Sequence, residues 1–168
     1  MVYSNYTTPT EQTIRLATPE IIIRKMQLQD LNKVWELETR IFRDPWSRNH
    51  LYHEILDNSI SFSFVVERDR EVIGYAIYWF IDNEAHIAKL AIDASFRGKQ
   101  YGDFLLCRVL EEMKCQKVQV VYLEVRRSNQ AAQQLYLKHG FKLIGTRRNY
   151  YSNDKEDALL MSLSLKEG

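Results

Sequence analysis

The stretch that decides the fold is residues 85–113, AHIAKLAIDASFRGKQYGDFLLCRVLEEM. Its first part, from Ile87 to Ile92, is almost entirely apolar, which is typical of a strand buried on both faces of a sheet. Further along, apolar residues recur at the three- and four-residue spacing of a helix: Leu105, Leu106, Val109, Leu110 and Met113. We therefore predict a strand, a turn over residues 97–103, and a helix with one face against the sheet.

The turn between this strand and helix is basic and reads Arg97-Gly98-Lys99-Gln100-Tyr101-Gly102-Asp103. A glycine-bearing turn that enters a helix suits a phosphate, because the first-turn amides have no intrahelical partner and the helix dipole adds positive charge there. The turn lacks the Gly-Lys-Ser/Thr ending of a P-loop and has too few glycines for a dinucleotide-binding fingerprint. The pyrophosphate of another cofactor and a plain strand-to-helix connection are both open readings of this pattern.

Two sets of motifs resemble a known family. Leu90-Ala91-Ile92-Asp93, followed by Arg97 through Gly102, resembles the coenzyme A motif of the GNAT N-acetyltransferases, Arg/Gln-x-x-Gly-x-Gly/Ala. From about Ile21 to the C-terminus the chain resembles the RimI branch, whose members acetylate the N-terminal alanine of a small-subunit ribosomal protein. The segments that carry this second likeness are Leu123–Asn129, Leu135-Tyr136, Gly140-Phe141, Arg147–Tyr151 and Glu156–Met161. Gln100 and Ala94 depart from the family pattern, which usually has glycine and proline there.

Length and composition indicate one globular domain. The chain has 168 residues, of which 45% are hydrophobic and 27% charged, and its net charge is +1. This balance argues against a general binder of nucleic acid or of membrane surfaces, and no apolar run reaches the roughly 20 residues that span a bilayer. Cys107 and Cys115 make neither a disulfide framework nor a metal set, so we expect reduced thiols and a cytoplasmic location.

The order of elements predicts a mixed α/β sheet flanked by helices, which is the GNAT acyltransferase fold that the resemblance implies. Residues 1–18 are polar and without period, so we expect a flexible extension without a signal peptide, followed by a GNAT domain over 19–168. Asp30 is placed to cap a helix whose apolar stripe includes Trp35, Ser47 to cap a second helix, and Gly140 to end the last one. Strands are expected at 21–26, 62–67, 72–81, 118–125, 141–148 and 158–165, with a helix at 129–138.

Glu124 and Tyr136 are the candidate base and acid. A free α-amine has a pKa of about 8 and must lose a proton before it attacks a thioester, and the departing thiolate benefits from an acid. Glu124 lies in an apolar strand, where we expect burial to raise its pKa, although the pattern also allows a solvated carboxylate or one paired with Arg126. From the pattern alone, Tyr136 is interpreted as a core-packing residue with its hydroxyl at the surface. The resemblance implies that Glu124 is the general base and Tyr136 the general acid.

The resemblance also assigns the coenzyme-binding residues. The backbone of Leu90, Ala91 and Ile92 would bind the acetyl and pantetheine portion of acetyl-CoA. The turn would hold the pyrophosphate, through Arg97, Gly98, Lys99, Gln100, Tyr101, Gly102 and Asp103. Asn129, which could merely cap its helix, would contact the coenzyme as well.

The remaining candidates concern the acceptor. Tyr150 and Tyr151 lie in a predicted loop, and Phe42 and Trp46 lie in the loop from Phe42 to Ser47; in similar enzymes these loops flank the peptide groove, although either could be a packed aromatic cluster. Glu84 could receive the positive N-terminus or be simply solvated. The four histidines, at 50, 53, 86 and 139, show no metal-ligand spacing, so no metal is expected.

These observations favour a protein N-α-acetyltransferase that uses acetyl-CoA and transfers the acetyl group directly within a ternary complex. The expected partner is the N-terminus of a protein, beginning with alanine and ribosomal by resemblance, with no direct nucleic-acid or membrane partner. We expect a monomer or a weak dimer. Two alternatives are an acetyltransferase for lysine or small amines, and a non-catalytic module that binds coenzyme A for regulation.

Overall fold

A computed structural model describes residues 19–166, so the predicted extension lies outside the described residues. The chain forms a seven-stranded sheet in the order β1-β2-β3-β4-β5-β7-β6, in which β4 and β5 are parallel and the other neighbouring strands are antiparallel. In chain order the elements are β1 (Ile21–Lys25), α1 (Leu31–Ile41), α2 (Arg48–Leu56), β2 (Ser61–Arg68), β3 (Glu71–Ile81), β4 (Glu84–Ile92), α3 (Tyr101–Cys115), β5 (Val120–Arg126), α4 (Gln130–Lys138), β6 (Lys142–Tyr151) and β7 (Glu156–Ser164). The predicted fold class is confirmed.

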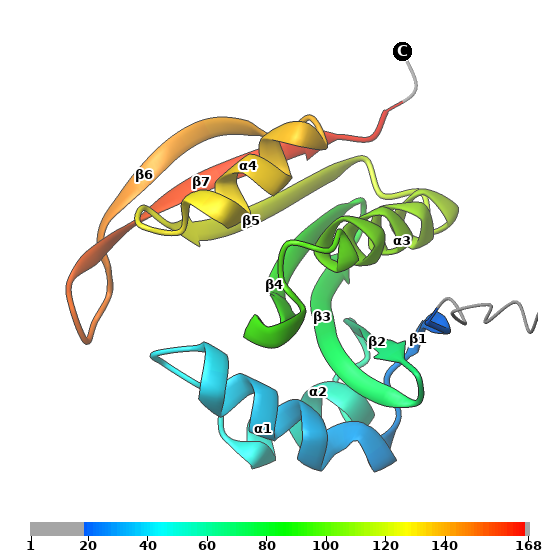
Figure 1. Ribbon diagram of the computed structural model, residues 1–168. Coiled ribbons are helices and arrows are strands. Elements are labelled where there is room, and N and C mark those ends of the chain that lie inside the picture. The colour runs from blue at the N-terminus through cyan, green and yellow to red at the C-terminus, as the bar shows by residue number, and fades with distance from the viewer. Residues whose placement is uncertain (1–18, 167–168) are drawn as a thin grey trace, which may run out of the picture.

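Helices cover both faces of the sheet. Figure 1 shows α1 and α2 on one face and α3 and α4 on the other. Each face has its own core: one is built around the apolar side of α3, and the other lies between α1, α2 and the middle strands. All five residues of the predicted helical stripe of α3 are buried. Across residues 19–166, the helices are too short or too polar to cross a membrane.

The two parallel strands separate part-way along their length. β4 pairs with β5 only at four positions, from Glu84 opposite Val120 to Ile87 opposite Leu123. Just beyond them, a register shift between β3 and β4 leaves Ala88 opposite no residue, and β4 and β5 then diverge, as Figure 1 shows. Among the described residues, no strand pairs with the facing edges of β4 beyond Ile87 and of β5 beyond Leu123. The sheet therefore has an opening with unpaired backbone groups on both sides.

Most predicted elements are confirmed, and three local expectations are wrong. The Ser47 hydroxyl caps α2 by accepting from the His50 amide at 3.1 Å, as expected. Asp30 does not cap α1 with its side chain, because Arg24 and the Gln27 amide hold that carboxylate. Trp35, assigned to the buried stripe of α1, is exposed. Tyr150 and Tyr151 end β6 instead of lying in a loop, because Tyr151 pairs with Glu156 of β7.

Candidate active site

Glu124 stands at the edge of the opening, on β5 one residue beyond its last paired position. Its side chain is only 10% exposed. One carboxylate oxygen is hydrogen-bonded to Nε2 of His86, and the other lies 3.5 Å from a guanidinium nitrogen of Arg147. The hydrogen bond from His86 is the main reason that the pKa of Glu124 is lowered; burial acts in the opposite direction and is outweighed. The expectation of a raised pKa for Glu124 is therefore wrong, because the hydrogen bond from His86 outweighs burial.

Tyr136 is buried in α4, against the core on the α3 side of the sheet. Its ring meets Phe141 edge-on, with centroids 5.5 Å apart. Burial raises the pKa of the hydroxyl above its ordinary value, so the group is protonated at neutral pH. A protonated phenol of this kind can donate to a negative charge that develops beside it.

Glu124 and Tyr136 face opposite sides of β5. Leu123 and Val125 belong to the core that contains Tyr136, and because strand side chains alternate, Glu124 points to the α1 and α2 side. The base and acid candidates thus lie on the two sides of the sheet, with Glu124 at the edge of the opening. In this arrangement an amine can approach from one side and a thioester from the other, with proton transfer available to each.

The turn that begins α3 has the open geometry expected of an anion site. Gly98 has a φ of +74°, and a side chain built there would meet nothing within 4 Å. Gln100 has a φ of +68°, a left-handed conformation that glycine adopts most easily. The Arg97 side chain donates from Nε to the Ile92 carbonyl at 3.1 Å, which braces the end of β4. Lys99 lies over the ring of Phe96 at 5.8 Å.

Two predicted coenzyme-binding residues have structural contacts of their own. The Asp103 carboxylate is bonded to both Lys138 and His139, and so ties the first turn of α3 to the end of α4. Asn129 caps α4, because its side-chain oxygen accepts from the Ala132 amide at 3.1 Å. These contacts fix the two helices on either side of the opening. Direct coenzyme contact by either residue stays a prediction.

The two predicted acceptor loops meet on the same side as Glu124. Arg43, in the loop from Phe42 to Ser47, contacts the Asp154 carboxylate of the β6–β7 turn at 2.9 Å. Arg126 joins the same two segments, because it lies 2.9 Å from both Asp44 and Asp154. Its guanidinium also covers the ring of Tyr151 at 3.8 Å. The ion pairs therefore bring the two loops together beside the opening.

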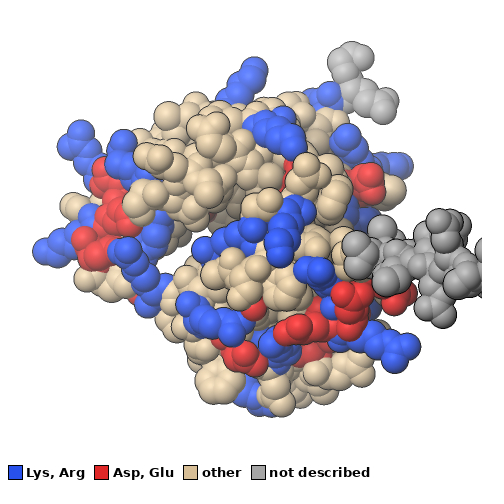
Figure 2. Space-filling model, in the orientation of Figure 1, with Lys and Arg blue, Asp and Glu red and all other residues tan. Residues whose placement is uncertain are grey.

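Figure 2 shows the same region in space-filling form. The surface is hollowed between the part that carries α4 and the part that carries α1, and Lys and Arg side chains stand beside this hollow. Glu84 is not brought there. It lies at the start of β4 opposite Val120, four residues before Glu124 and so roughly 13 Å away along the strands.

Comparison with known proteins identifies the family. Residues 31–141 match the acetyltransferase (GNAT) family. The chain belongs to the GNAT acetyltransferases. A Bacillus subtilis relative, provisionally named a [ribosomal protein bS18]-alanine N-acetyltransferase, is 37% identical over 145 residues, which are 86% of this chain and 96% of the relative. A Haemophilus ducreyi protein of the same name, without that qualification, is 32% identical over 140 residues, with 82% and 95% of the two chains covered.

A solved structure supports the same placement. The crystal structure of the Escherichia coli ribosomal-protein-S18-alanine N-acetyltransferase superposes on this GNAT chain with a TM-score of 0.82. The two are 28% identical, and the alignment covers 89% of this chain and 96% of the other. The chain is thus an N-acetyltransferase of the branch that its C-terminal motifs resemble.

Three residues of this GNAT site escaped the sequence reasoning. His86 was weighed only as a metal ligand, yet it contacts Glu124. Lys89 and Glu38 form a buried ion pair of 2.7 Å beside the acceptor loop. In a regular strand, side chains alternate between the two faces, so Lys89 would lie on the face opposite to Glu84 and His86. The register shift at Ala88 breaks this alternation and places Lys89 on the α1 side. A lysine within a strand that is otherwise apolar was the one available signal.

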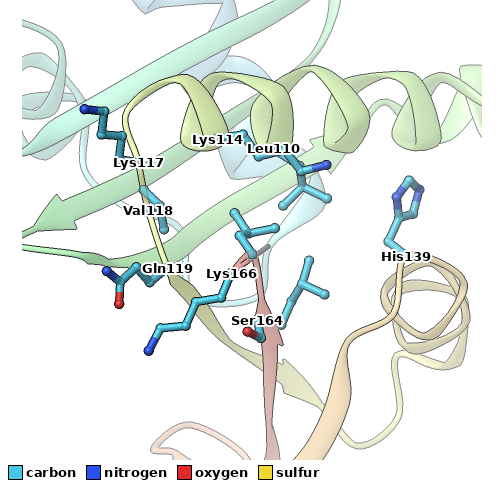
Figure 3. Close-up of a pocket in the computed structure, with 10 residues that line it drawn as sticks. Leu110, Lys114, Lys117, Val118, Gln119, His139, Ser164 and Lys166 are labelled. Carbon is cyan, nitrogen blue, oxygen red and sulfur yellow. The ribbon is translucent and has the colours of Figure 1, made fainter. Parts of the chain in front are cut away.

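Two other features of this GNAT chain lie apart from Glu124. A cavity of about 830 Å³, shown in Figure 3, lies between the end of α3, the start of β5 and the end of β7, and its lining includes neither Glu124 nor Tyr136. Asp103, Cys107 and His139 bring possible metal ligands within 4.8 Å of one another, a grouping that the sequence spacing did not predict. Lys138 already neutralises the carboxylate of that group.

Proposed function

We propose that the protein transfers the acetyl group of acetyl-CoA to the N-terminal amine of a protein that begins with alanine, and that this acceptor is ribosomal protein bS18. The single observation that carries the proposal is the placement of Glu124 and Tyr136 on opposite sides of β5, with Glu124 at the edge of the opening in the sheet. The relatives named for bS18-alanine acetylation support the choice of acceptor.

The residues around the opening fit acetyl-CoA. The segment from Leu90 to Ile92 lies on β4 beyond its last position paired with β5, and its backbone would bind the acetyl and pantetheine part. The turn from Gly98 to Asp103 would hold the pyrophosphate, because the amides of the first turn of α3 and the free space at Gly98 allow close approach of an anion. Acetyl-CoA supplies an acetyl group on a thioester, which a free amine can attack without any covalent enzyme intermediate.

The chain then performs two proton transfers. Glu124, on the α1 side, accepts the proton that the α-amine releases, and Tyr136, on the α4 side, donates to the thiolate that departs. Arg147 and His86 keep Glu124 ionised and ready to accept. Burial keeps Tyr136 protonated at neutral pH and ready to donate. Backbone amides at the opening would stabilise the oxyanion.

The acceptor would lie between the loop from Phe42 to Ser47 and the end of β6, with Trp46, Tyr150 and Tyr151 along its path. An α-amine suits this site better than lysine, because its pKa of about 8 lies closer to neutrality than the value of about 10.4 for a lysine side chain. A ribosomal acceptor would place the reaction in the cytoplasm.

The test uses peptides that offer both an N-terminal alanine and an internal lysine. With acetyl-CoA and the purified protein, mass spectrometry should locate the acetyl group on the terminus, and a peptide with a blocked N-terminus should stay unmodified. The N-terminal sequence of bS18 should be modified faster than a scrambled peptide that also begins with alanine. Modification of the lysine alone would make the protein a lysine acetyltransferase, and coenzyme A binding without turnover would indicate a regulatory module.

A further inference from the structure

Three side chains of different chemistry meet where α3 begins and α4 ends. Asp103 and Cys107 are four residues apart on α3, so both project from the same side of that helix. His139 follows the last residue of α4, and its Nε2 is hydrogen-bonded to Oδ1 of Asp103. The ligand atoms of the three side chains all lie within 4.8 Å of one another, the one such group among residues 19–166. Acetyl transfer as proposed above gives Cys107 and His139 no task.

The spacing of these three atoms suits a small cation. Zn²⁺ lies about 2.3 Å from a thiolate sulfur and about 2.0 to 2.2 Å from an imidazole nitrogen or a carboxylate oxygen. Two ligand atoms on one tetrahedral ion are therefore about 3.3 to 3.6 Å apart. From the present spacing, the three side chains reach these positions by changes of roughly 1 Å, which side-chain rotation supplies without moving either helix.

The Asp103 carboxylate divides its two oxygens between two partners. Oδ1 faces His139, whereas Oδ2 accepts from the Lys138 ammonium at 2.5 Å. A cation at Oδ1 can replace the hydrogen bond to His139 while Lys138 still holds Oδ2. A ligating carboxylate that a further side chain holds by hydrogen bonding is the usual arrangement around bound metals. The Lys138 side chain is 64% exposed and Cys107 is exposed, so the ammonium can turn away from the ion and the ion can enter from solvent.

The types of ligand indicate which cation fits. Mg²⁺ and Ca²⁺ are bound by oxygen ligands, whereas this group offers a single carboxylate beside a thiol and an imidazole. Zn²⁺ accepts all three kinds of ligand, and three protein ligands with water at the fourth position is one of its common arrangements. The site is thus of the kind that binds zinc.

We propose that Asp103, Cys107 and His139 bind one Zn²⁺ ion, which joins the beginning of α3 to the end of α4. On binding, the Cys107 thiol releases its proton to water, and the neutral imidazole coordinates through Nε2 and carries its proton on Nδ1. The ion lies on the face of the sheet that α3 and α4 cover (Figure 1), whereas Glu124 points to the other face. Its effect is structural: three bonds to one ion replace a single hydrogen bond between His139 and α3.

The test uses the metal-free full chain without acetyl-CoA or acceptor, so it does not depend on the proposed function. Calorimetry with Zn²⁺ should show one site per chain, and the thermal unfolding midpoint should rise as Zn²⁺ is added. Cys107→Ser and His139→Gln should each weaken Zn²⁺ binding by about 100-fold or more, because loss of an outer partner alone already costs about 10- to 100-fold. Co²⁺ in place of Zn²⁺ should give the near-ultraviolet absorption of a thiolate bound to cobalt, and Cys107→Ser should abolish it.

Two matched controls come from the same chain. Cys115→Ser removes the other exposed thiol of α3, and His53→Gln removes a histidine that is bonded to Asp57 at 2.7 Å but, among the described residues, has no third ligand beside it. Both variants should bind Zn²⁺ as tightly as the parent. The inference is wrong if the parent shows no saturable binding, if its Co²⁺ form lacks the thiolate absorption, or if Cys107→Ser binds Zn²⁺ as tightly as Cys115→Ser does. Loss of acetyl transfer with Zn²⁺ binding intact would count against the proposed function alone.

Discussion

The proposed base and acid occupy environments that act on their protonation in opposite directions. His86 and Arg147 surround the carboxylate of Glu124 with hydrogen-bond and charge partners, which favour the ionised form. Tyr136 has the edge of Phe141 and an apolar core around it, which favour the neutral form. A base must be ionised and an acid protonated before the reaction begins. Each side chain is therefore in the form that its proposed role requires at neutral pH.

Removing either group should slow turnover without unfolding the protein. We expect Glu124→Gln to lower kcat by about two to four orders of magnitude, the usual contribution of a positioned base. Tyr136→Phe should lower it by a smaller factor, about 10 to 100, because a thiolate can also depart without an acid. Steady-state assays with an alanine peptide, together with calorimetry for acetyl-CoA, would measure both effects.

A control for Tyr136→Phe is available elsewhere in the same core. Tyr78 is fully buried, and its hydroxyl donates to Gln116 at 2.9 Å, far along α3 from the opening. Tyr78→Phe removes a buried hydroxyl but no proposed proton donor, so kcat should stay at the parent value. An equal loss of kcat in Tyr136→Phe and Tyr78→Phe would remove Tyr136 from the mechanism. An unchanged kcat in Glu124→Gln would remove Glu124.

At the scale of elements, both ends of α3 use a side chain where glycine is the usual choice. Gln100, before the first turn, has a φ of +68°, and Lys117, after the last, has a φ of +64°. The C-terminal end is a Schellman motif, since the Lys117 amide donates to the Lys114 carbonyl and the Val118 amide to that of Met113. Gln100 lies in the proposed pyrophosphate turn, whereas Lys117 lies at the other end of α3.

This pair of positions gives a matched test of the turn. Gln100→Gly and Lys117→Gly each relieve backbone strain of roughly 1 kcal/mol in the folded protein, because glycine adopts the left-handed conformation easily. Glycine also makes the unfolded chain more flexible, which offsets part of this gain in stability. In urea unfolding we expect each variant to be as stable as the parent or up to about 1 kcal/mol more stable. By calorimetry Gln100→Gly should bind acetyl-CoA at least as tightly as the parent, and Lys117→Gly equally tightly. Weaker binding by the first variant alone would show that the Gln100 side chain itself contacts the coenzyme.

The loop between α1 and α2 is held by a buried carboxylate. Glu38 is 0% exposed and accepts from Lys89 and from the Trp46 amide, each at 2.7 Å, and from the hydroxyl of Tyr75. The Lys89 ammonium in turn lies 3.9 Å from the ring centre of Phe42. Burial lowers the pKa of Lys89, and the attraction of Glu38 opposes this. One carboxylate thus ties the predicted acceptor residues Phe42 and Trp46 to β3 and β4.

Breaking this pair should affect both stability and acceptor binding. Glu38→Ala leaves a buried ammonium without its partner, so we expect a loss of about 3–5 kcal/mol in urea unfolding. Because the loop is released, KM for the peptide should rise by more than the Kd for acetyl-CoA does. The double variant Glu38→Gln with Lys89→Met should recover part of the stability, since it removes both charges. A double variant less stable than Glu38→Ala would contradict this account.

The sequence is informative where structure depends on short spacing. Residues 85–113 predict β4 and α3 because period and burial are local properties, and Ser47 and Gly140 are end signals that act within a few residues. The opening between β4 and β5 depends on a register shift against β3, which no single segment encodes. The lowered pKa of Glu124 comes from His86, 38 residues away along the chain. Contacts of this kind have no local signature.

At the scale of the whole molecule, the strand pairing divides the sheet into two parts. The strands β5, β6 and β7 join the rest of the sheet through only four paired positions of β4 and β5. On the far side of the opening, Arg43 and Arg126 bridge the α1–α2 loop to the β6–β7 turn. These bridges are partly exposed, so each adds little energy by itself. They nevertheless connect the two parts of the sheet at the end where β4 and β5 are not paired.

Several carboxylates make the whole molecule sensitive to acid. The pKa values of Glu124, Asp30, Asp103, Asp154 and Glu156 all lie below their ordinary values in the folded protein. For Asp30, burial raises the pKa, but hydrogen bonds from Arg24 and the Gln27 amide outweigh it. A carboxylate with a lowered folded pKa binds fewer protons when folded than when unfolded. Its contribution to stability is complete above the unfolded value and is lost as pH falls through the folded value.

We therefore expect the free energy of unfolding to be nearly constant from pH 7 to about 5, and to fall steadily below the ordinary carboxylate range near pH 4. Urea unfolding at a series of pH values would measure this. Asp30 is the most informative position, because its carboxylate is buried against Arg24 at 2.7 Å. Asp30→Asn should cost about 1.5–3 kcal/mol at pH 7, the usual worth of hydrogen bonds to a charged group, and should flatten the fall between pH 5 and 3. Asp57→Asn is the control, because that carboxylate is exposed and, among residues 19–166, is bonded only to the exposed His53. If Asp30→Asn costs stability at pH 7 but leaves the acid slope as steep as in the parent, the other carboxylates carry the pH dependence and Asp30 acts only through its neutral contacts.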